Sequence, residues 1–229
     1  MSHLFNLPDN LYDNYDFNEI SKFKKLYLFF HSRFFILIYK LFKNNIYAKV
    51  INLFFVKKGK VTYIKNLGYS YHYQNTSIVY PNKLRIFRAI DKLDNLKIRF
   101  EEKYFLNKIN FKRGDLIVDC GANIGELYFS VSDNKDFEYI AFEPDINNFK
   151  CLSKNLSNFK NVKLYETGLS NKSGEEKLYI SSDGSDSSFS YYGDQKHVVV
   201  KTNPLDFFKI NKVKLLKIEA EGFEPEILI

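Results

Sequence analysis

From residue 114 onward, short apolar runs alternate with helix-like segments, and this alternation constrains the fold more than any other feature of the sequence. The apolar runs cover 116–118, 139–142, 162–165 and 213–218, and the helix-like segments cover 124–132 and 146–156. Alternation of this kind is typical of an open parallel sheet with helices on its faces. We therefore predict an α/β fold for residues 114–229, with an antiparallel insertion formed by 177–180 and 197–201.

The first 113 residues differ in charge from the rest of the chain. They contain 21 Lys and Arg against 8 Asp and Glu, a net charge of +13, whereas residues 114–229 carry −6, which gives +7 overall. Between residues 20 and 90 there are 14 basic residues and no acidic one. Such a surplus indicates contact with an anionic partner, namely a phosphate-bearing substrate, a membrane surface or nucleic acid, and a solvated basic face is the alternative. We treat 1–113 as a basic, aromatic-rich extension, helical at first and then mixed.

Apolar residues recur every three or four positions near the start of this extension, which predicts a helix that ends near residue 41. They are Phe23, Leu26, Tyr27, Phe30, Phe34, Leu37, Ile38 and Leu41. Lysines and arginines border or oppose this side, the pattern of a helix that lies on a membrane surface; packing on its own domain or on a partner subunit is the alternative. Polar and charged residues interrupt the stretch, so it falls short of the roughly 20 apolar residues that a membrane span needs.

The remainder of the extension predicts a second helix, three short strands and a longer helical region, over 46–56, 60–65, 69–73, 77–80 and 84–109. Within the last of these, we expect Phe100, Tyr104 and Phe105 to be buried. The two cysteines, Cys120 and Cys151, suit a reducing compartment, and the polar, acidic N-terminus does not resemble a secretory signal. We therefore expect a cytoplasmic protein that is peripheral at the inner face of the membrane if residues 20–58 bind anionic lipid.

A glycine-containing loop joins the first parallel strand to its helix, with the sequence Asp119-Cys120-Gly121-Ala122-Asn123-Ile124-Gly125. Glycines let the backbone approach a ligand, and a helix start offers free N–H groups. Glu143 directly follows the second strand, where a carboxylate can accept two hydrogen bonds from a ribose diol. Ligands of open α/β sheets bind at the carboxyl ends of strands, so the loop and Glu143 together predict a nucleoside site. A structural turn with a surface glutamate is the alternative.

Two cofactors fit such a site, a nicotinamide dinucleotide and S-adenosylmethionine. A dinucleotide loop has the pattern G-x-G-x-x-G and seats a pyrophosphate at the helix N-terminus. This loop has D-x-G-x-x-x-G, and its aspartate would repel a pyrophosphate but suit the cationic amino-acid end of S-adenosylmethionine. The residues therefore favour S-adenosylmethionine. The candidate binding residues are Asp119, Gly121, Ala122, Asn123 and Gly125 at the methionine end, Glu143 at the ribose, and Glu166 and Thr167 beside the adenine.

Five motifs, in order, resemble those of the FkbM-like methyltransferases. They are Val118–Gly125, Phe142-Glu143-Pro144, Leu169-Ser170-Asn171 with Gly174, Leu205-Asp206, and Lys217–Glu224. The resemblance covers about 115–229 and implies a doubly wound, Rossmann-like class I methyltransferase sheet. It also implies O-methylation of a hydroxyl on a sugar, polyketide or similar metabolite, and many relatives are encoded with surface-polysaccharide synthesis. The extension lies outside the resemblance, which therefore says nothing about the choice of acceptor.

The chain departs from the family's pattern at two points. The family usually has K-I-D-x-E-G after the fourth strand, whereas this chain has Lys217-Ile218-Glu219-Ala220-Glu221-Gly222, and the longer glutamate displaces a carboxylate that could position the acceptor. The chain also stops inside the helix after the fourth strand, whereas a class I sheet normally continues with three more strands. We therefore expect a sheet that is truncated after its fourth core strand. Since this would leave a hydrophobic edge strand, which natural proteins avoid, the sequence resembles a fragment or a truncated gene product.

Glu219 and Glu221 are the candidate general bases for an acceptor hydroxyl, and a role at a helix N-terminus is the alternative for Glu221. No histidine lies beside the carboxylates at 219, 221 and 224, so no metal is predicted. The expected partner is a small-molecule or glycan acceptor. RNA methylation by the basic half is one alternative, although no recognised RNA-binding module is present. A non-catalytic, membrane-associated protein with a vestigial methyltransferase fold is the other.

Overall fold

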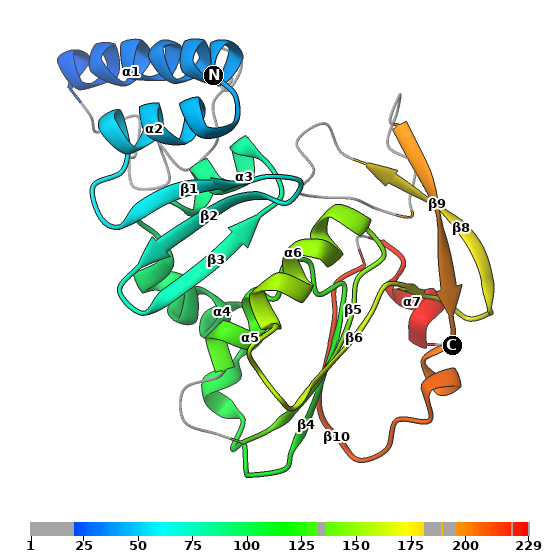
Figure 1. Ribbon diagram of the computed structural model, residues 1–229. Coiled ribbons are helices and arrows are strands. Elements are labelled where there is room, and N and C mark those ends of the chain that lie inside the picture. The colour runs from blue at the N-terminus through cyan, green and yellow to red at the C-terminus, as the bar shows by residue number, and fades with distance from the viewer. Residues whose placement is uncertain (1–20, 132–135, 181–188, 190–195, 221, 229) are drawn as a thin grey trace.

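The computed structural model describes residues 21–131, 136–180, 189, 196–220 and 222–228. Its C-terminal half is built on a four-stranded sheet. The strands are β4 (Leu116–Cys120), β5 (Glu138–Phe142), β6 (Val162–Tyr165) and β10 (Val213–Ile218). They lie in the order β10-β4-β5-β6, and every neighbouring pair is parallel (Figure 1). The parallel sheet confirms the predicted α/β class.

Both faces of this sheet are covered. β4 and β5 are buried along most of their length, and their alternate residues point to opposite sides. Ile117 and Tyr139 pack in a cluster with two helices, whereas Val118 and Phe142 pack in a second cluster on the other face. The covering elements are α5 (Glu126–Val131) and α6 (Ile146–Leu156) on the first face, and the 3-10 segment η5 (Leu205–Phe208) and α7 (Glu224–Leu228) on the second. The bounds of α6, β6 and β10 are those that the sequence predicted. Helix α5 begins two residues later than expected.

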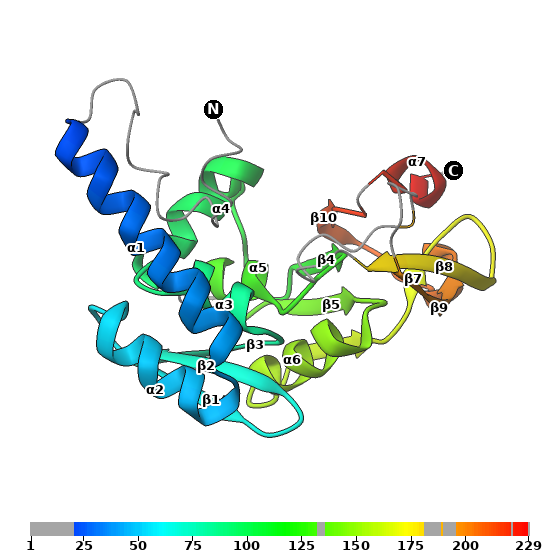
Figure 2. The same cartoon turned by 90° about the horizontal axis from the view of Figure 1, so that it is seen from above.

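A second sheet lies beside the carboxyl ends of these strands (Figure 2). It contains β7 (Gly168–Leu169), β8 (Gly174–Ile180) and β9 (Lys196–Asn203), in the order β7-β9-β8. β8 and β9 are antiparallel, with Gly174 opposite Thr202 and Ile180 opposite Lys196. They form the antiparallel insertion that the sequence predicted, with longer strands than expected.

The N-terminal extension begins with two helices and a small antiparallel sheet. The elements are α1 (Lys22–Leu41), α2 (Asn44–Phe54), β1 (Lys60–Ile64), β2 (Gly68–Tyr73) and β3 (Thr76–Tyr80), and the sheet order is β1-β2-β3. Ser21 caps α1 by accepting a hydrogen bond from the Lys24 amide. All five elements agree with the sequence prediction to within about two residues.

Asparagine side chains pair with both outer strands of the small sheet. On β1, the side chain of Asn52 accepts from the Val61 amide at 2.8 Å and donates to the Val61 carbonyl at 2.7 Å. On β3, Asn155 of α6 accepts from the Val79 amide at 2.7 Å and donates to the Val79 carbonyl at 3.1 Å. Asn155 also donates to the Ile124 carbonyl, so it links the extension to the loop after β4. Each amide thus satisfies the backbone groups that a strand edge leaves open.

The single helical region expected over 84–109 is wrong, because the chain forms two helices there, α3 (Lys83–Ala89) and α4 (Leu96–Tyr104). The break falls at Asp91, which has a φ of 59° and whose carboxylate accepts hydrogen bonds from the amides of Lys57 and Lys58. These long-range bonds outweigh the local helical pattern. A second left-handed residue, Phe105, ends α4 and is 68% exposed, which corrects its expected burial.

Helix α1 packs inward through Leu28, Ser32, Phe35 and Ile38, and not through most of the apolar residues that the sequence pattern picked out. Of that predicted apolar side, only Ile38 is buried. The other seven members point outward, and no helix among the described residues is long and apolar enough to cross a membrane.

Candidate active site

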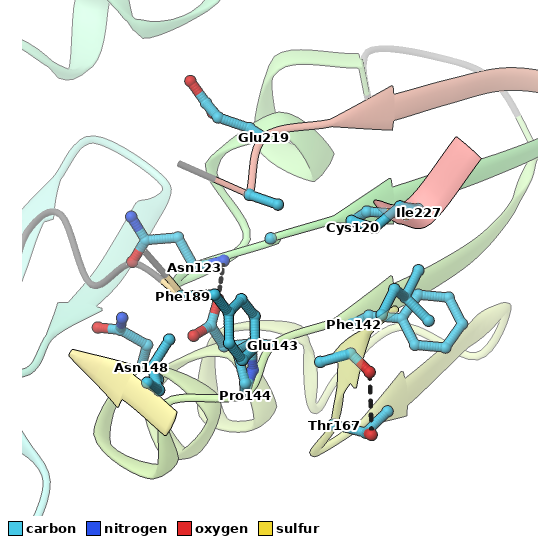
Figure 3. A pocket seen from close by; sticks show the side chains of 15 residues that line it. Cys120, Asn123, Phe142, Glu143, Pro144, Asn148, Thr167, Phe189, Glu219 and Ile227 are labelled. Carbon is cyan, nitrogen blue, oxygen red and sulfur yellow. Dashed lines mark hydrogen bonds between the residues drawn. The ribbon is translucent and has the colours of Figure 1, made fainter. Parts of the chain in front are cut away.

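A pocket open to solvent lies at the carboxyl ends of the parallel strands, where an open α/β sheet places its ligands. Its empty volume is about 650 Å³. Residues that follow β4, β5, β6 and β10 line it, among them Gly121, Asn123, Glu143, Asn148, Thr167 and Glu219 (Figure 3). The strand tips therefore bring together the loop, the glutamate and the carboxylate that the sequence singled out.

The loop after β4 is held against two neighbouring strand tips. The amides of Gly121 and Ala122 both donate to the Phe142 carbonyl at 3.0 Å. Gly121 has a φ of 72°, and a Cβ atom there would lie 2.0 Å from the backbone oxygen of Glu219. Only glycine permits this approach, because any side chain would collide with the backbone at the end of β10. The loop thus presents its backbone to the pocket.

Glu143 is enclosed at the base of the pocket and is fixed by the backbone on both oxygens. Its Oε2 accepts from the Asn123 amide at 2.8 Å, and its Oε1 accepts from the Asp145 amide at 2.9 Å. Burial raises the pKa of Glu143 to about 7, although these two N–H donors act in the opposite direction. Each oxygen retains a lone pair for a ligand hydroxyl.

Asp119 lies beneath the loop and does not line the pocket. Its side chain is on the same face of the sheet as Tyr139, whose hydroxyl donates to Oδ2. Oδ1 lies 2.9 Å from Nζ of Lys217, the residue in register with Asp119 on β10. Lys217 also donates to the carbonyl of Gly121 at 2.7 Å. Asp119 and Lys217 therefore form a buried ion pair that supports the loop from below.

Burial acts to lower the pKa of Lys217, but the carboxylates of Asp119 and Glu219 outweigh it and hold that pKa above its ordinary value. The second of these carboxylates lies 3.4 Å from Nζ, so Lys217 bridges two acidic side chains. The ammonium group stays charged at neutral pH.

Glu219 is half-buried at the end of β10, and the N-terminal extension holds its carboxylate. Lys103 forms an ion pair with Oε1, and the Tyr104 hydroxyl donates to Oε2 at 2.6 Å. Burial acts to raise the pKa of Glu219, but these donors and Lys217 lower it below its ordinary value. A carboxylate with a lowered pKa is a weak proton acceptor at neutral pH. Its side chain points away from Glu143 (Figure 3).

The remaining predicted residues are divided between the pocket and its surroundings. Thr167 lines the pocket, and its hydroxyl donates to the Lys201 carbonyl of β9 at 2.9 Å. Ala122 is buried in the core, and Gly125 packs against Leu152 of α6, where a Cβ would lie 2.9 Å from that side chain. Glu166 is exposed outside the pocket lining. Glu221 lies outside the described residues.

Three functional candidates escaped the sequence reasoning, namely Lys103, Tyr104 and Lys217. A lysine at the carboxyl end of a predicted strand, directly after two leucines, was a readable signal for Lys217, because a buried cation needs a partner. Lys103 and Tyr104 carried no comparable signal, since they reach the site only through the packing of α4 beside α5. Among the described residues, no group of three or more His, Cys, Asp or Glu side chains is arranged to hold a metal ion.

A family model and several solved structures are similar to this chain. The solved structure of P. horikoshii TYW2 in complex with MeSAdo is similar to the chain at 16% identity and a TM-score of 0.36. That similarity covers 56% of this chain and 51% of the other, so the chain spans about half of that protein. No curated protein matches the chain. The family model described as Methyltransferase FkbM domain matches residues 119–229, a span that contains the loop, Glu143 and Glu219. The C-terminal half of the chain therefore matches the FkbM methyltransferase domain, the family that its ordered motifs predicted.

Proposed function

We propose that the pocket binds S-adenosylmethionine and that the protein transfers the methyl group to a hydroxyl of a small-molecule or glycan acceptor. The observation that carries this proposal is the orientation of the Glu143 carboxylate. Two backbone amides hold one oxygen each, so the carboxylate faces the pocket with a free lone pair on both oxygens. A ribose diol supplies two hydroxyl donors with the matching spacing.

The loop from Gly121 to Asn123 would lie against the methionine end of the cofactor. Its backbone approaches the pocket closely because Gly121 has no side chain, and Lys217 fixes the Gly121 carbonyl from below. Asp119 remains a candidate for the cationic amino group, but its carboxylate is already paired with Lys217 and Tyr139. We therefore assign Asp119 a positioning role through the loop. Thr167 also lines the pocket and remains the candidate neighbour of the adenine.

S-adenosylmethionine supplies an electrophilic methyl group on a sulfonium centre. The protein's contribution is to align the acceptor oxygen with that methyl group and to exclude water. Glu219 is close enough to the pocket to orient an acceptor hydroxyl, but its lowered pKa makes it a poor base in the free protein. Glu221 remains the other candidate for the proton acceptor.

The test is calorimetric titration of the protein with S-adenosylmethionine and S-adenosylhomocysteine. We expect Glu143→Gln to weaken binding by about 10- to 100-fold, because a neutral amide replaces the charged acceptor of two hydrogen bonds. Glu138→Gln is the matched control, since Glu138 is exposed at the amino end of the same strand. A folded wild-type protein that binds neither ligand would contradict the proposal and favour a non-catalytic role.

A further inference from the structure

We propose that the outward face of α1 and α2 docks on an anionic lipid surface. This α1–α2 face consists of Phe23, Leu26, Tyr27, Phe30, Phe34, Leu37 and Leu41 on α1, and Ile46, Leu53 and Phe54 on α2. The inference is independent of the methyltransferase proposal, because it concerns a surface on the extension and its test needs no enzyme activity.

The face is strongly apolar and open among the described residues. Phe23 is 85% exposed, Phe30 62% and Leu53 76%. Phe34 and Phe54 meet edge to face with their ring centroids 5.0 Å apart, so the two helices contribute to one continuous surface. Contiguous exposed apolar surface of this kind marks a site of contact with a protein or a membrane.

The core of the extension does not depend on this face. Helix α1 packs inward through a separate stripe of residues. From this stripe, the Phe35 ring stacks on the Phe87 ring of α3, with the two ring centroids 3.7 Å apart. The helix thus has two apolar stripes, and the inner one supplies its buried residues. Both views of the molecule place α1 at its outer boundary, beside α2 (Figures 1 and 2).

Basic residues adjoin the face and point to its partner. Lys22, Arg33 and Lys40 are eleven and seven residues apart, so they lie on one line along α1, beside the apolar stripe. All three are exposed, as are Lys43 and Lys49 at α2. An exposed aromatic and aliphatic face with a basic border is the composition of helices that lie in the headgroup region of anionic membranes.

Charge also argues against a second copy of this chain as the occupant. Residues 20–90 hold 14 basic residues and no acidic ones, so two such faces in contact would bring like charges together. An anionic bilayer offers the opposite charge and an apolar interior at once. Helix α1 has 20 residues, about 30 Å of length that can lie parallel to the membrane plane.

The experiment is flotation of the full chain with vesicles of 70% phosphatidylcholine and 30% phosphatidylglycerol, compared with pure phosphatidylcholine. We expect binding to the anionic vesicles that weakens at high salt. The triple variant Lys22→Gln, Arg33→Gln and Lys40→Gln should bind on the order of 100-fold more weakly, from about fivefold for each charge. The control variant removes three exposed charges elsewhere, with Lys154→Gln, Lys160→Gln and Lys163→Gln, and should bind as the wild type does.

The apolar contribution is tested with Phe30→Ser and Leu37→Ser, which we expect to lower binding at least tenfold without changing the melting temperature. Phe207→Ser is the matched control, because Phe207 is 63% exposed on η5, away from the face. Equal binding of the wild type and both face variants would overturn the proposal. So would an absence of vesicle binding by folded protein. In that case, light scattering would identify a second copy as the occupant if the chain is dimeric, and residues 1–20 would be the next candidate if it is monomeric.

Discussion

Nζ of Lys217 lies 2.9 Å from Oδ1 of Asp119, and both side chains are almost wholly enclosed. The pair joins β10 to β4 directly below the loop that borders the pocket. A buried pair of this kind adds little over an apolar pair, but removing one partner leaves an uncompensated charge.

Lys217→Met should therefore destabilise the protein by about 3–5 kcal/mol, a fall of roughly 6–20 °C in melting temperature for a chain of this length. The double variant Asp119→Asn, Lys217→Met should recover more than half of the loss, because Asn still accepts from Tyr139. Lys172→Met is the control: Lys172 forms an exposed ion pair with Glu176 at 3.9 Å, and its loss should change stability by less than about 0.5 kcal/mol. Thermal melts followed by circular dichroism measure all three, and a double variant no better than the single would contradict a net role for the pair.

Ligand binding should depend on pH through Glu143. Burial raises the pKa of this carboxyl to about 7 in the free protein, and the ligand requires the deprotonated form as acceptor. Affinity for S-adenosylhomocysteine should therefore be highest above pH 7 and fall as the pH drops through 7, by up to about tenfold per unit. Titrations at pH 6.0, 7.0 and 8.5 check this. Glu143→Gln removes the protein's share of the dependence and leaves only that of the ligand, so identical pH profiles for the two proteins would refute the assignment.

Gly121→Ala should abolish ligand binding and destabilise the protein by about 2–4 kcal/mol, because it combines an unfavourable φ with a collision against the Glu219 backbone. Gly114→Ala separates the two causes. Gly114 has a φ of 80°, but a Cβ there would meet nothing within 4 Å, so its substitution should cost only about 1–2 kcal/mol. Urea unfolding compares the two variants, and equal losses would show that the close approach of the strand tips is unimportant.

Asn155→Ala should destabilise the protein by about 2–4 kcal/mol, since it leaves the amide and carbonyl of Val79 and the carbonyl of Ile124 without their partner. Asn147→Ala is the control on the same helix, where the side chain is exposed and the loss should stay below about 0.5 kcal/mol. Differential scanning calorimetry gives both values. A small effect at Asn155 would mean that water replaces the amide at the edge of β3.

Much of the fold follows from local patterns in the sequence. The apolar runs at 162–165 and 213–218 are strands with those bounds, and Asp145 starts α6 as a capping residue should. The break at Asp91 could not be predicted in this way, because its partners are the amides of Lys57 and Lys58, more than thirty residues earlier. A local pattern carries no information about such contacts.

The site was predictable to the extent that strand tips define it. Gly121, Asn123, Glu143, Thr167 and Glu219 line one pocket because the ends of parallel strands meet at one edge of a sheet. The orientation of Asp119 was not foreseen, since a side chain near the end of a strand faces either side of the sheet according to the strand's register. The contact of Lys103 and Tyr104 with Glu219 depends on how α4 packs, which the sequence alone does not give.

The hydrogen bonds of the Asn155 side chain to β3 join the two differently charged halves of the chain, so the halves should not fold as independent units. Ile124 and Cys151 from the C-terminal half are buried in the same cluster as Tyr71 and Ile78 of the small sheet. The composition changes at residue 113, but the interior is shared across that point. Recombination that exchanged one half for a foreign sequence would therefore need compensating changes at these positions, and the intact protein should melt in one cooperative transition.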